Sequence, residues 1–297
     1  MADPFLDGFD AHRIEANGAA LNVRRAGTGT PLILLHGFPQ NGACWHRVAP
    51  ALAERHDVIV PDLRGYGASD APEDDPAHET YSKRTMAADL AALMDALGID
   101  AAHVMGHDRG ARAAYRLALD RPERVRRLAI LEILPTAEYW RAMDAEFAMA
   151  VYHWTFLAQP APMPERLIAG DPEGYVRHTL ASWTGAKTLD AFAPSALEGY
   201  LAQAREPARV HAMCADYRAG ATTDRAHDEA NLAAGTRIEA PLACLFAETG
   251  FPARTGDPAA IWRRWAEDVV TGTCPSGHFV PEEAPDAVLA LAASHFD

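Results

Sequence analysis

One aspartate stands where a sharp turn between a strand and a helix would expose its side chain. The apolar run 102–108 closes with Gly106-His107-Asp108. Arg109 and Gly110 come next and open a helical pattern. The two glycines permit such a turn, so the motif resembles the elbow that presents a nucleophile above a parallel sheet. A carboxylate there attacks a saturated carbon, expels a leaving group and becomes an ester. Aspartate therefore favours dehalogenation or epoxide opening over acyl transfer. The alternative is that Asp108 only caps the following helix.

A histidine base and an orienting acid would complete this chemistry. His278 lies in SGHF, after the last predicted strand and before the last predicted helix, where it could activate water against the ester. Glu132 and Glu248 each stand at the end of a predicted strand, and either could accept the imidazole N–H. Strand ends alone leave these two acids open. His36 and His107 are better interpreted as structural residues.

Two arginines follow the proposed nucleophile one helical turn apart. Arg109 and Arg112 would face one cavity and repel each other unless an anion bridges them or acids neutralise them. A substrate carboxylate held by both would gain charge-assisted hydrogen bonds of about 1.5–3 kcal/mol each. The same grip would orient the substrate carbon toward Asp108. The alternative is a salt-bridge network on a solvated helix face.

Aromatic side chains supply hydrogen-bond donors for a leaving group. Tyr152-His153-Trp154 and Tyr217 carry N–H and O–H groups that could hold a departing fluoride, which needs donors as it loses water. An apolar lid core is the alternative interpretation of this stripe. We also expect Phe38 to belong to the pocket or to an oxyanion site.

Strands alternate with helices on both sides of one long helical stretch. Residues 11–26 predict a hairpin around Asn17-Gly18. Buried strands are predicted within 31–37, 57–62, 102–108, 127–133 and 240–248, a helix at 81–97, and a last strand and helix near the end of the chain. This alternation predicts a mainly parallel sheet with helices on both faces. We expect a core domain of residues 1–136 and 237–297, with 137–236 as a helical cap over the carboxyl edge of the sheet.

The composition excludes several classes of partner. A net charge of −14 over 297 residues argues against nucleic acid and against an anionic membrane surface. The first residues lack the pattern of a secretory signal, and no stretch is apolar enough to span a membrane. The four cysteines, at 44, 214, 244 and 274, are widely spaced, so we expect reduced thiols and a cytoplasmic protein.

The sequence closely resembles the fluoroacetate (haloacetate) dehalogenases, which have the α/β-hydrolase fold. The matching segments run from LLHGFPQ through GHDRGARAAYRLALD, LEILPT, HWTFLAQPAPMPERLI and DYRAGAT to SGHF, and so cover nearly the whole chain. The resemblance implies Asp108 as nucleophile and His278 as base. It favours Glu132 as the acid that orients His278. The family has aspartate at this position, so the longer glutamate could alter the geometry of the contact with His278 and the reaction rate, more than the mechanism.

The same resemblance assigns the remaining site residues. It implies a carboxylate clamp of Arg109 and Arg112 and a fluoride pocket of His153, Trp154 and Tyr217. It further implies a homodimer without a metal, and we expect no cofactor. The expected reaction converts fluoroacetate and other small 2-haloacids, with water, to 2-hydroxy acids and halide. An epoxide hydrolase with the same Asp and His is the alternative, and a non-catalytic ligand-binding protein of this fold is the alternative from another class.

Overall fold

The computed structural model describes residues 6–297, which form an eight-stranded sheet in the order β1-β2-β4-β3-β5-β6-β7-β8. The first two strands pair antiparallel with each other, and β2 also pairs antiparallel with β4, whereas all other pairs are parallel. The strands are β1 Asp10–Ala16, β2 Ala19–Ala26, β3 Thr30–Leu35, β4 His56–Pro61, β5 Ala102–His107, β6 Val125–Leu131, β7 Leu242–Ala247 and β8 Val269–Cys274.

Helices occupy both faces of the sheet and the long connection between β6 and β7. Those of the core are α1 Ala49–Leu52, α2 Lys83–Ala96, α3 Asp108–Asp120, α12 Pro258–Trp265, α13 Val280–Glu283 and α14 Pro285–Phe296. Those of the connection are α4 Thr136–Arg141, α5 Ala145–Ala150, α6 Tyr152–Leu157, α7 Met163–Ile168, α8 Pro172–Trp183, α9 Pro194–Ala204, α10 Pro207–Ala221 and α11 Thr223–Ala234. Short 3-10 turns add η1 Gly42–Trp45, η2 Pro122–Arg124 and η3 Pro252–Thr255.

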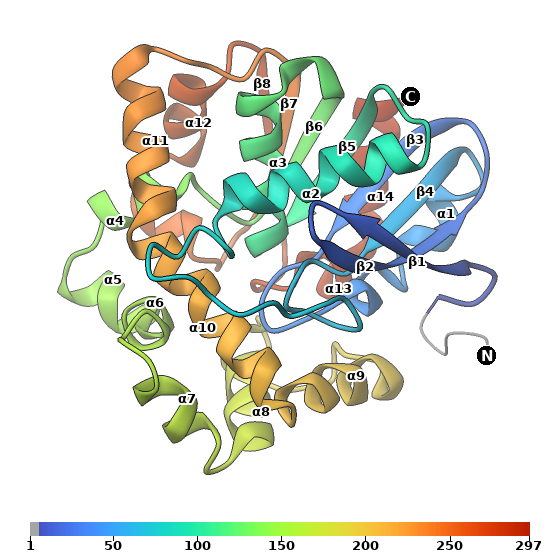
Figure 1. Ribbon diagram of the computed structural model, residues 1–297. Helices are drawn as coiled ribbons and strands as arrows, with labels where there is room; N and C mark the ends of the chain where they lie inside the picture. Colours follow the sequence, from blue (N-terminus) through green and yellow to red (C-terminus); the bar gives the residue numbers. More distant parts are fainter. Residues whose placement is uncertain (1–5) are drawn as a thin grey trace.

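The central strands are buried along their whole length, and mainly apolar, because both faces of the sheet are covered. Every residue of β4, β5 and β7 is buried. In Figure 1, α2 and α3 lie in front of the sheet and α14 lies behind it, and α14 contacts β6 and β7. Continuous apolar runs, rather than alternating ones, are what such doubly covered parallel strands require.

The predicted elements match the structure with small shifts at their ends. The hairpin turns at Asn17 and Gly18, with φ of 50° and 77°. Each predicted buried strand is present, and its ends lie within one to three residues of the predicted ends. The sequence analysis missed α1, α13 and the 3-10 turns, because elements of three or four residues are too short to show a periodic pattern.

The regular elements of the connection between β6 and β7 are all helices, and we call α4 to α11 the helical insert. The stretch 132–241, all of it described, contains no strand. It spans the stretch 137–236 for which the sequence predicts a cap. In Figure 1 the insert extends away from the sheet, with α10 running through it. Helix α10 brings Asp216 and Tyr217 against the start of α3, so the insert covers the end of the sheet from which Asp108 projects.

The turn that carries Asp108 is tightly packed against neighbouring backbone. Asp108 itself has a φ of 47°, a backbone conformation that is unfavourable for residues other than glycine. A Cβ atom on Gly106 would lie 2.5 Å from Ala111 Cα, and one on Gly110 would overlap the His36 carbonyl. Glycine at these two positions therefore lets the strand, the turn and the helix pack together.

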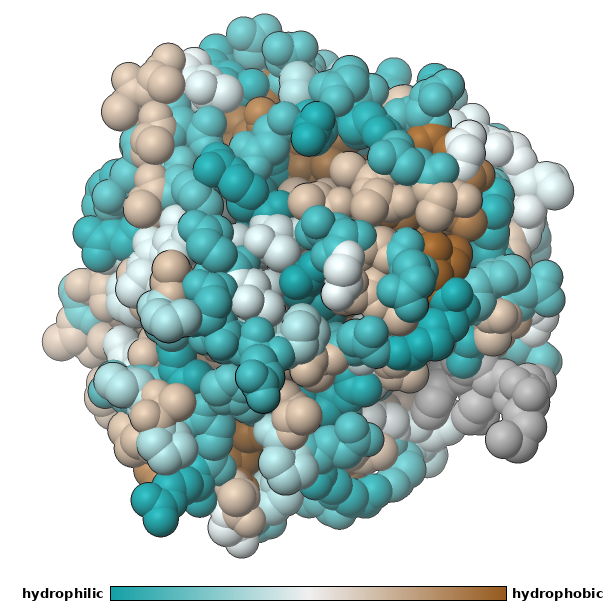
Figure 2. All heavy atoms as spheres, in the orientation of Figure 1, coloured by the Kyte–Doolittle hydropathy of each residue, from teal (hydrophilic) through white to brown (hydrophobic). Residues whose placement is uncertain are grey.

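The outer surface fits the acidic composition. Figure 2 shows one face covered mainly by hydrophilic residues, with the more hydrophobic ones in separate patches. Among residues 6–297, no helix is both long and apolar enough to cross a bilayer. All four cysteines are buried and free.

Gly110→Ala should destabilise the protein and displace Asp108. Its new Cβ meets rigid backbone, and such overpacking costs about 1–3 kcal/mol or more. For a chain of this length, the Tm falls by about 2–4 °C for each kcal/mol. Gly272→Ala in β8 is the matched control, because its Cβ would meet only the Leu245 side chain at 3.6 Å. Equal Tm values for the two variants in thermal unfolding would contradict the close packing.

Candidate active site

Asp108 lies at the centre of the candidate site and is held by a backbone donor. The Phe38 amide donates a 2.8 Å hydrogen bond to Asp108 Oδ1, and His278 Nε2 lies 3.8 Å from Oδ2. Burial by itself would raise the pKa of Asp108, but His278, His107 and the two arginines more than offset it and lower the pKa. Asp108 is therefore ionised, as a carboxylate nucleophile must be.

His278 is positioned through its backbone, and its ring is left available. Its amide donates to the Trp183 carbonyl at 2.9 Å, and its own carbonyl accepts from His107 Nε2 at 2.7 Å. Within residues 6–297, neither imidazole nitrogen has a hydrogen-bond partner. Burial, with a further contribution from His107, lowers the pKa of His278 to about 3. The ring is thus neutral at neutral pH.

Burial separates the two candidate acids. Glu248 is exposed at the end of β7, whereas Glu132 is fully buried at the end of β6 with a φ of 58°. Glu132 Oε2 accepts from the Ala247 amide at 2.6 Å, and Oε1 has no partner among the described residues. Neither acid is hydrogen-bonded to His278 in the described part of the chain. Gly250 leaves room for Glu132, because a Cβ there would overlap its carboxylate.

Both arginines are buried, which excludes the alternative of a salt-bridge network on a solvated face. Arg109 is 0% exposed and pairs with Asp216, from which Nε is 3.1 Å distant. Arg112 is 1% exposed, and its Nη1 donates to the Leu134 carbonyl at 2.9 Å and to Thr136 Oγ1 at 3.0 Å. Within residues 6–297, no carboxylate oxygen lies within 4.0 Å of the Arg112 guanidinium. Asp216 therefore pairs with Arg109, whereas only neutral oxygens accept hydrogen bonds from Arg112.

Aromatic rings enclose the two guanidinium groups. The Arg109 guanidinium carbon lies 4.3 Å from the Tyr217 ring centre, and that of Arg112 lies 4.6 Å from the Trp154 ring centre. Tyr217 also meets the Phe38 ring edge-on, with centroids 5.2 Å apart. His153 lies 5.6 Å from Tyr217 by the same measure. The predicted clamp and the predicted fluoride pocket are thus adjacent.

Several buried donors of this cluster have unused hydrogen-bonding capacity. In the part of the chain that the structure describes, Arg109 Nη1, Arg112 Nε, Tyr217 Oη and His153 Nδ1 have no hydrogen-bond partner. Burial lowers the pKa of His153 well below its usual value, so its ring is neutral. Buried polar atoms are rarely left unpaired, and their concentration around Asp108 indicates a place for a polar ligand.

Comparison with known proteins identifies the fold family. The model of the α/β hydrolase fold family matches residues 30–217, more than half of the chain. The chain belongs to the α/β hydrolase fold family. The fold class predicted from the sequence is therefore confirmed.

Individual relatives of this α/β hydrolase include two reaction classes. A fluoroacetate dehalogenase from Burkholderia sp is 40% identical over 281 residues, covering 95% of this chain and 91% of the relative. A soluble epoxide hydrolase from Corynebacterium sp. (strain C12) is 33% identical over 288 residues, covering 96% of each. The crystal structure of ALR0039 from Nostoc sp PCC 7120 has a TM-score of 0.94 at 45% identity, covering 97% of this chain and 98% of that one.

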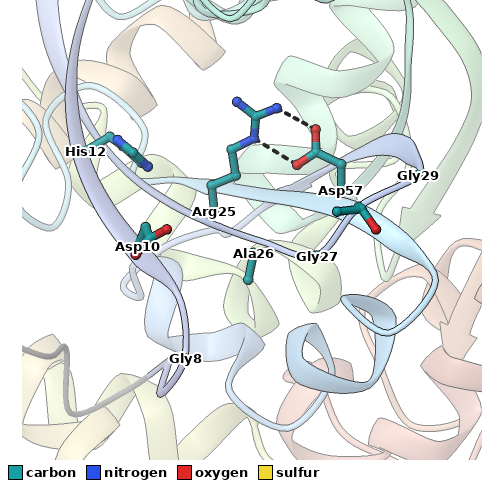
Figure 3. A pocket seen from close by; sticks show the side chains of 9 residues that line it. Gly8, Asp10, His12, Arg25, Ala26, Gly27, Gly29 and Asp57 are labelled. Atoms are coloured by element: carbon teal, nitrogen blue, oxygen red, sulfur yellow. Dashed lines mark hydrogen bonds and ion pairs between the residues drawn. The ribbon is translucent and has the colours of Figure 1, made fainter.

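A hollow of 490 Å³ at the boundary of core and insert leads to His278 in this α/β hydrolase. Trp183, Phe251 and Lys187 are among the residues that line it. A comparable hollow of 510 Å³ lies elsewhere, at Gly27–Gly29. Figure 3 shows that its charged residues Arg25 and Asp57 satisfy each other, with hydrogen bonds of 2.8 and 2.7 Å. The hollow at His278 is the one of the two that reaches a residue of the candidate site, although Asp108 and the two arginines do not line it.

The sequence analysis missed three residues that shape the site. Trp183 lies 4.2 Å from His153 and 5.4 Å from His278 between ring centroids, and Phe251 lies 5.3 Å from His278. Asp216 lies within the quoted motif DYRAGAT, yet no pattern pointed to its contact with Arg109. Among residues 6–297, no group of three or more His, Cys, Asp or Glu side chains could hold a metal ion.

Glu132 should make the stability of the protein depend on pH. Burial raises the pKa of Glu132 from its usual 4.5 to about 8. The folded protein therefore holds this proton more tightly than the unfolded chain. The contribution of Glu132 to the free energy of unfolding is fully present below pH 4.5 and is lost as the pH rises through about 8.

Replacing Glu132 tests this pH dependence. Glu132→Gln removes the ionisable group, so we expect its Tm relative to the unaltered protein to increase between pH 5 and pH 9. Each kcal/mol corresponds to about 2–4 °C. Glu248→Gln is the control, because Glu248 is exposed. Parallel Tm curves for Glu132→Gln and the unaltered protein would show that Glu132 is ionised in the folded state at neutral pH.

Proposed function

We propose that this α/β hydrolase releases halide from fluoroacetate and other small 2-haloacids and forms the corresponding 2-hydroxy acids. The observation that carries the proposal is Arg112, which is buried beside Asp108 without a carboxylate within 4.0 Å among residues 6–297. A buried, unpaired cation is costly. An anionic substrate would supply the missing countercharge and draw its α-carbon toward Asp108.

The first step in this proposal is displacement at the α-carbon. Asp108 Oδ2 attacks opposite the carbon–halogen bond, and the halide leaves with the bonding electron pair. Oδ1 then becomes the ester carbonyl oxygen, which remains next to the Phe38 amide. For fluoride, the proposed donors are the His153 and Trp154 ring N–H groups and the Tyr217 hydroxyl. Tyr217 Oη has no other hydrogen-bond partner within residues 6–297.

The second step is hydrolysis of the ester. His278 removes a proton from water, and the resulting hydroxide attacks Cγ of Asp108. The Phe38 amide would stabilise the oxyanion that forms on Oδ1. The tetrahedral intermediate collapses to release the 2-hydroxy acid, whose alkoxide oxygen takes the proton from His278. Asp108 is left with the second proton of the water and loses it to solvent, which restores the carboxylate. Glu132 is the proposed acid that stabilises the imidazolium during this step. Because its pKa is about 8, it would have to lose its own proton before it could do so at neutral pH.

Opening of an epoxide is the second candidate, because a relative named as a soluble epoxide hydrolase is 33% identical. Tyr217 could donate to an epoxide oxygen with its unpartnered hydroxyl. A neutral epoxide, however, would leave the buried Arg112 charge uncompensated. The pairing of Asp108 with His278 at 3.8 Å argues against a protein that only binds a ligand. The 40% identity to a fluoroacetate dehalogenase also favours the first candidate.

Release of halide tests the proposal directly. Ion-selective electrodes should detect fluoride from fluoroacetate and chloride from chloroacetate in the presence of the purified protein. Styrene oxide, assayed in parallel for diol formation, addresses the second candidate. Diol formation without halide release would favour the epoxide hydrolase.

His278→Asn should stop the reaction after the first step. The halide is then released once per active site, and Asp108 retains a carboxymethyl ester that raises the intact mass. A double variant that also carries Asp108→Ala is the control, because it lacks the nucleophile and should gain no mass. Absence of both the burst and the adduct in His278→Asn, with turnover present in the unaltered protein, would reject the two-step scheme.

Arg112→Leu should impair haloacetate turnover mainly through weaker binding. The loss of one charge-assisted contact corresponds to about 1.5–3 kcal/mol, or roughly a tenfold to hundredfold rise in KM. Arg112→Lys keeps the charge but not the planar donor geometry, so its KM should lie between those of the unaltered protein and Arg112→Leu. Steady-state kinetics with fluoroacetate and chloroacetate measure both variants. A KM and kcat unchanged in Arg112→Leu would remove this residue from the clamp.

A further inference from the structure

We infer that Asp216 is a positioning residue that aims Arg109 at the substrate carboxylate, and that Lys83 keeps Asp216 from neutralising Arg109 completely. The inference rests on the proposed function, in which Arg109 is one arm of the clamp. It adds two residues, one on α10 and one on α2, that would govern substrate binding without touching the substrate.

Asp216 occupies three of the donor positions of Arg109. The guanidinium donates from Nε to Asp216 Oδ2 at 3.1 Å, from Nη2 to Oδ1, and from Nη2 to the Asp216 carbonyl at 2.7 Å. Only Nη1 has no partner among residues 6–297, although it is buried. A planar guanidinium held along one edge has a fixed direction, so Asp216 determines where the free Nη1 donors point.

Neighbouring residues hold this arrangement in place. The Tyr66 hydroxyl donates to Asp216 Oδ2 at 2.8 Å, which fixes the carboxylate from a third side. A Cβ on Gly220, one helical turn along α10, would lie 3.1 Å from Arg109 Nη2. A larger residue there would press on the guanidinium. The position of Arg109 therefore depends on α10 as well as on its own helix.

Lys83 shares the charge of Asp216. It is 1% exposed at the start of α2, and its ammonium pairs with Asp216 Oδ1 and lies 4.0 Å from Asp224 Oδ2. Burial by itself would raise the pKa of Asp216, but Arg109 and Lys83 lower it to about 2, so the carboxylate is ionised. Because Lys83 draws on the Asp216 carboxylate as well as on Asp224, Asp216 does not neutralise Arg109 completely, and Arg109 retains attraction for a further anion. Removing Lys83 would leave Arg109 more completely neutralised.

The chain offers a closely matched control for Asp216. Asp228 is also a buried aspartate of the insert that pairs with an arginine of α3, since its Oδ1 accepts from Arg116 Nη2 at 2.7 Å. Arg116 lies two turns beyond Arg109 on α3 and away from Asp108. A loss that results only from breaking a buried ion pair should therefore be the same in Asp216→Asn and Asp228→Asn.

The experiment compares Asp216→Asn, Lys83→Met and Asp228→Asn in the full chain. We measure KM and kcat for chloroacetate and the Kd of acetate by calorimetry. For Asp216→Asn we expect KM and Kd to rise about tenfold or more, with a smaller change in kcat. Lys83→Met should weaken acetate binding in the same direction, whereas Asp228→Asn should leave KM and Kd unchanged.

The readouts distinguish this inference from the proposed function. Absence of halide release by the unaltered protein overturns the proposed function, while acetate binding still tests the arginine arrangement. Weaker acetate binding in Asp216→Asn and Lys83→Met, but not in Asp228→Asn, supports the inference. The inference is overturned if all four proteins bind acetate equally, or if Asp216→Asn and Asp228→Asn lose the same affinity. It is also overturned if the unaltered protein does not bind acetate. Should Asp216→Asn not fold, Lys83→Met decides, since tighter or unchanged acetate binding there contradicts charge sharing.

Discussion

The candidate site is organised around two positively charged side chains that are buried next to the Asp108 carboxylate. Arg109 and Arg112 are 0% and 1% exposed, on the first two turns of the helix that begins at Asp108. Buried charges are tolerated only where other groups compensate them. Asp216 does so for Arg109, while neutral oxygens and aromatic faces surround Arg112. This incomplete compensation distinguishes the site from an ordinary buried ion pair and favours an anionic ligand.

The same charges explain why two buried carboxylates behave in opposite ways. Asp108 and Glu132 are both removed from solvent, and burial alone would raise the pKa of each. Cationic and imidazole groups around Asp108 offset that effect and lower its pKa, whereas Glu132 receives mainly backbone hydrogen bonds and its pKa rises to about 8. Asp108 is therefore ionised, as the proposed nucleophile must be, whereas Glu132 keeps its proton up to about pH 8.

Much of this architecture could be predicted because its causes are local. The hairpin at Asn17-Gly18 needs residues that tolerate positive φ, and a doubly covered strand such as β7 needs an uninterrupted apolar run. The turn at Asp108 needs small residues at Gly106 and Gly110, because neighbouring backbone leaves no room for a side chain. Each of these requirements concerns a few consecutive residues, so the sequence displays it directly.

The candidate nucleophile, the base and the pair of arginines could all be predicted, because each follows from residue type and its place relative to a strand or helix. Their surroundings could not be predicted in this way. Asp216 reaches Arg109 from 107 positions away, and burial rather than sequence position separates Glu132 from Glu248. The physical reason is that charge compensation and desolvation depend on distances between side chains from different elements, and those distances exist only once the helical insert has packed onto the sheet.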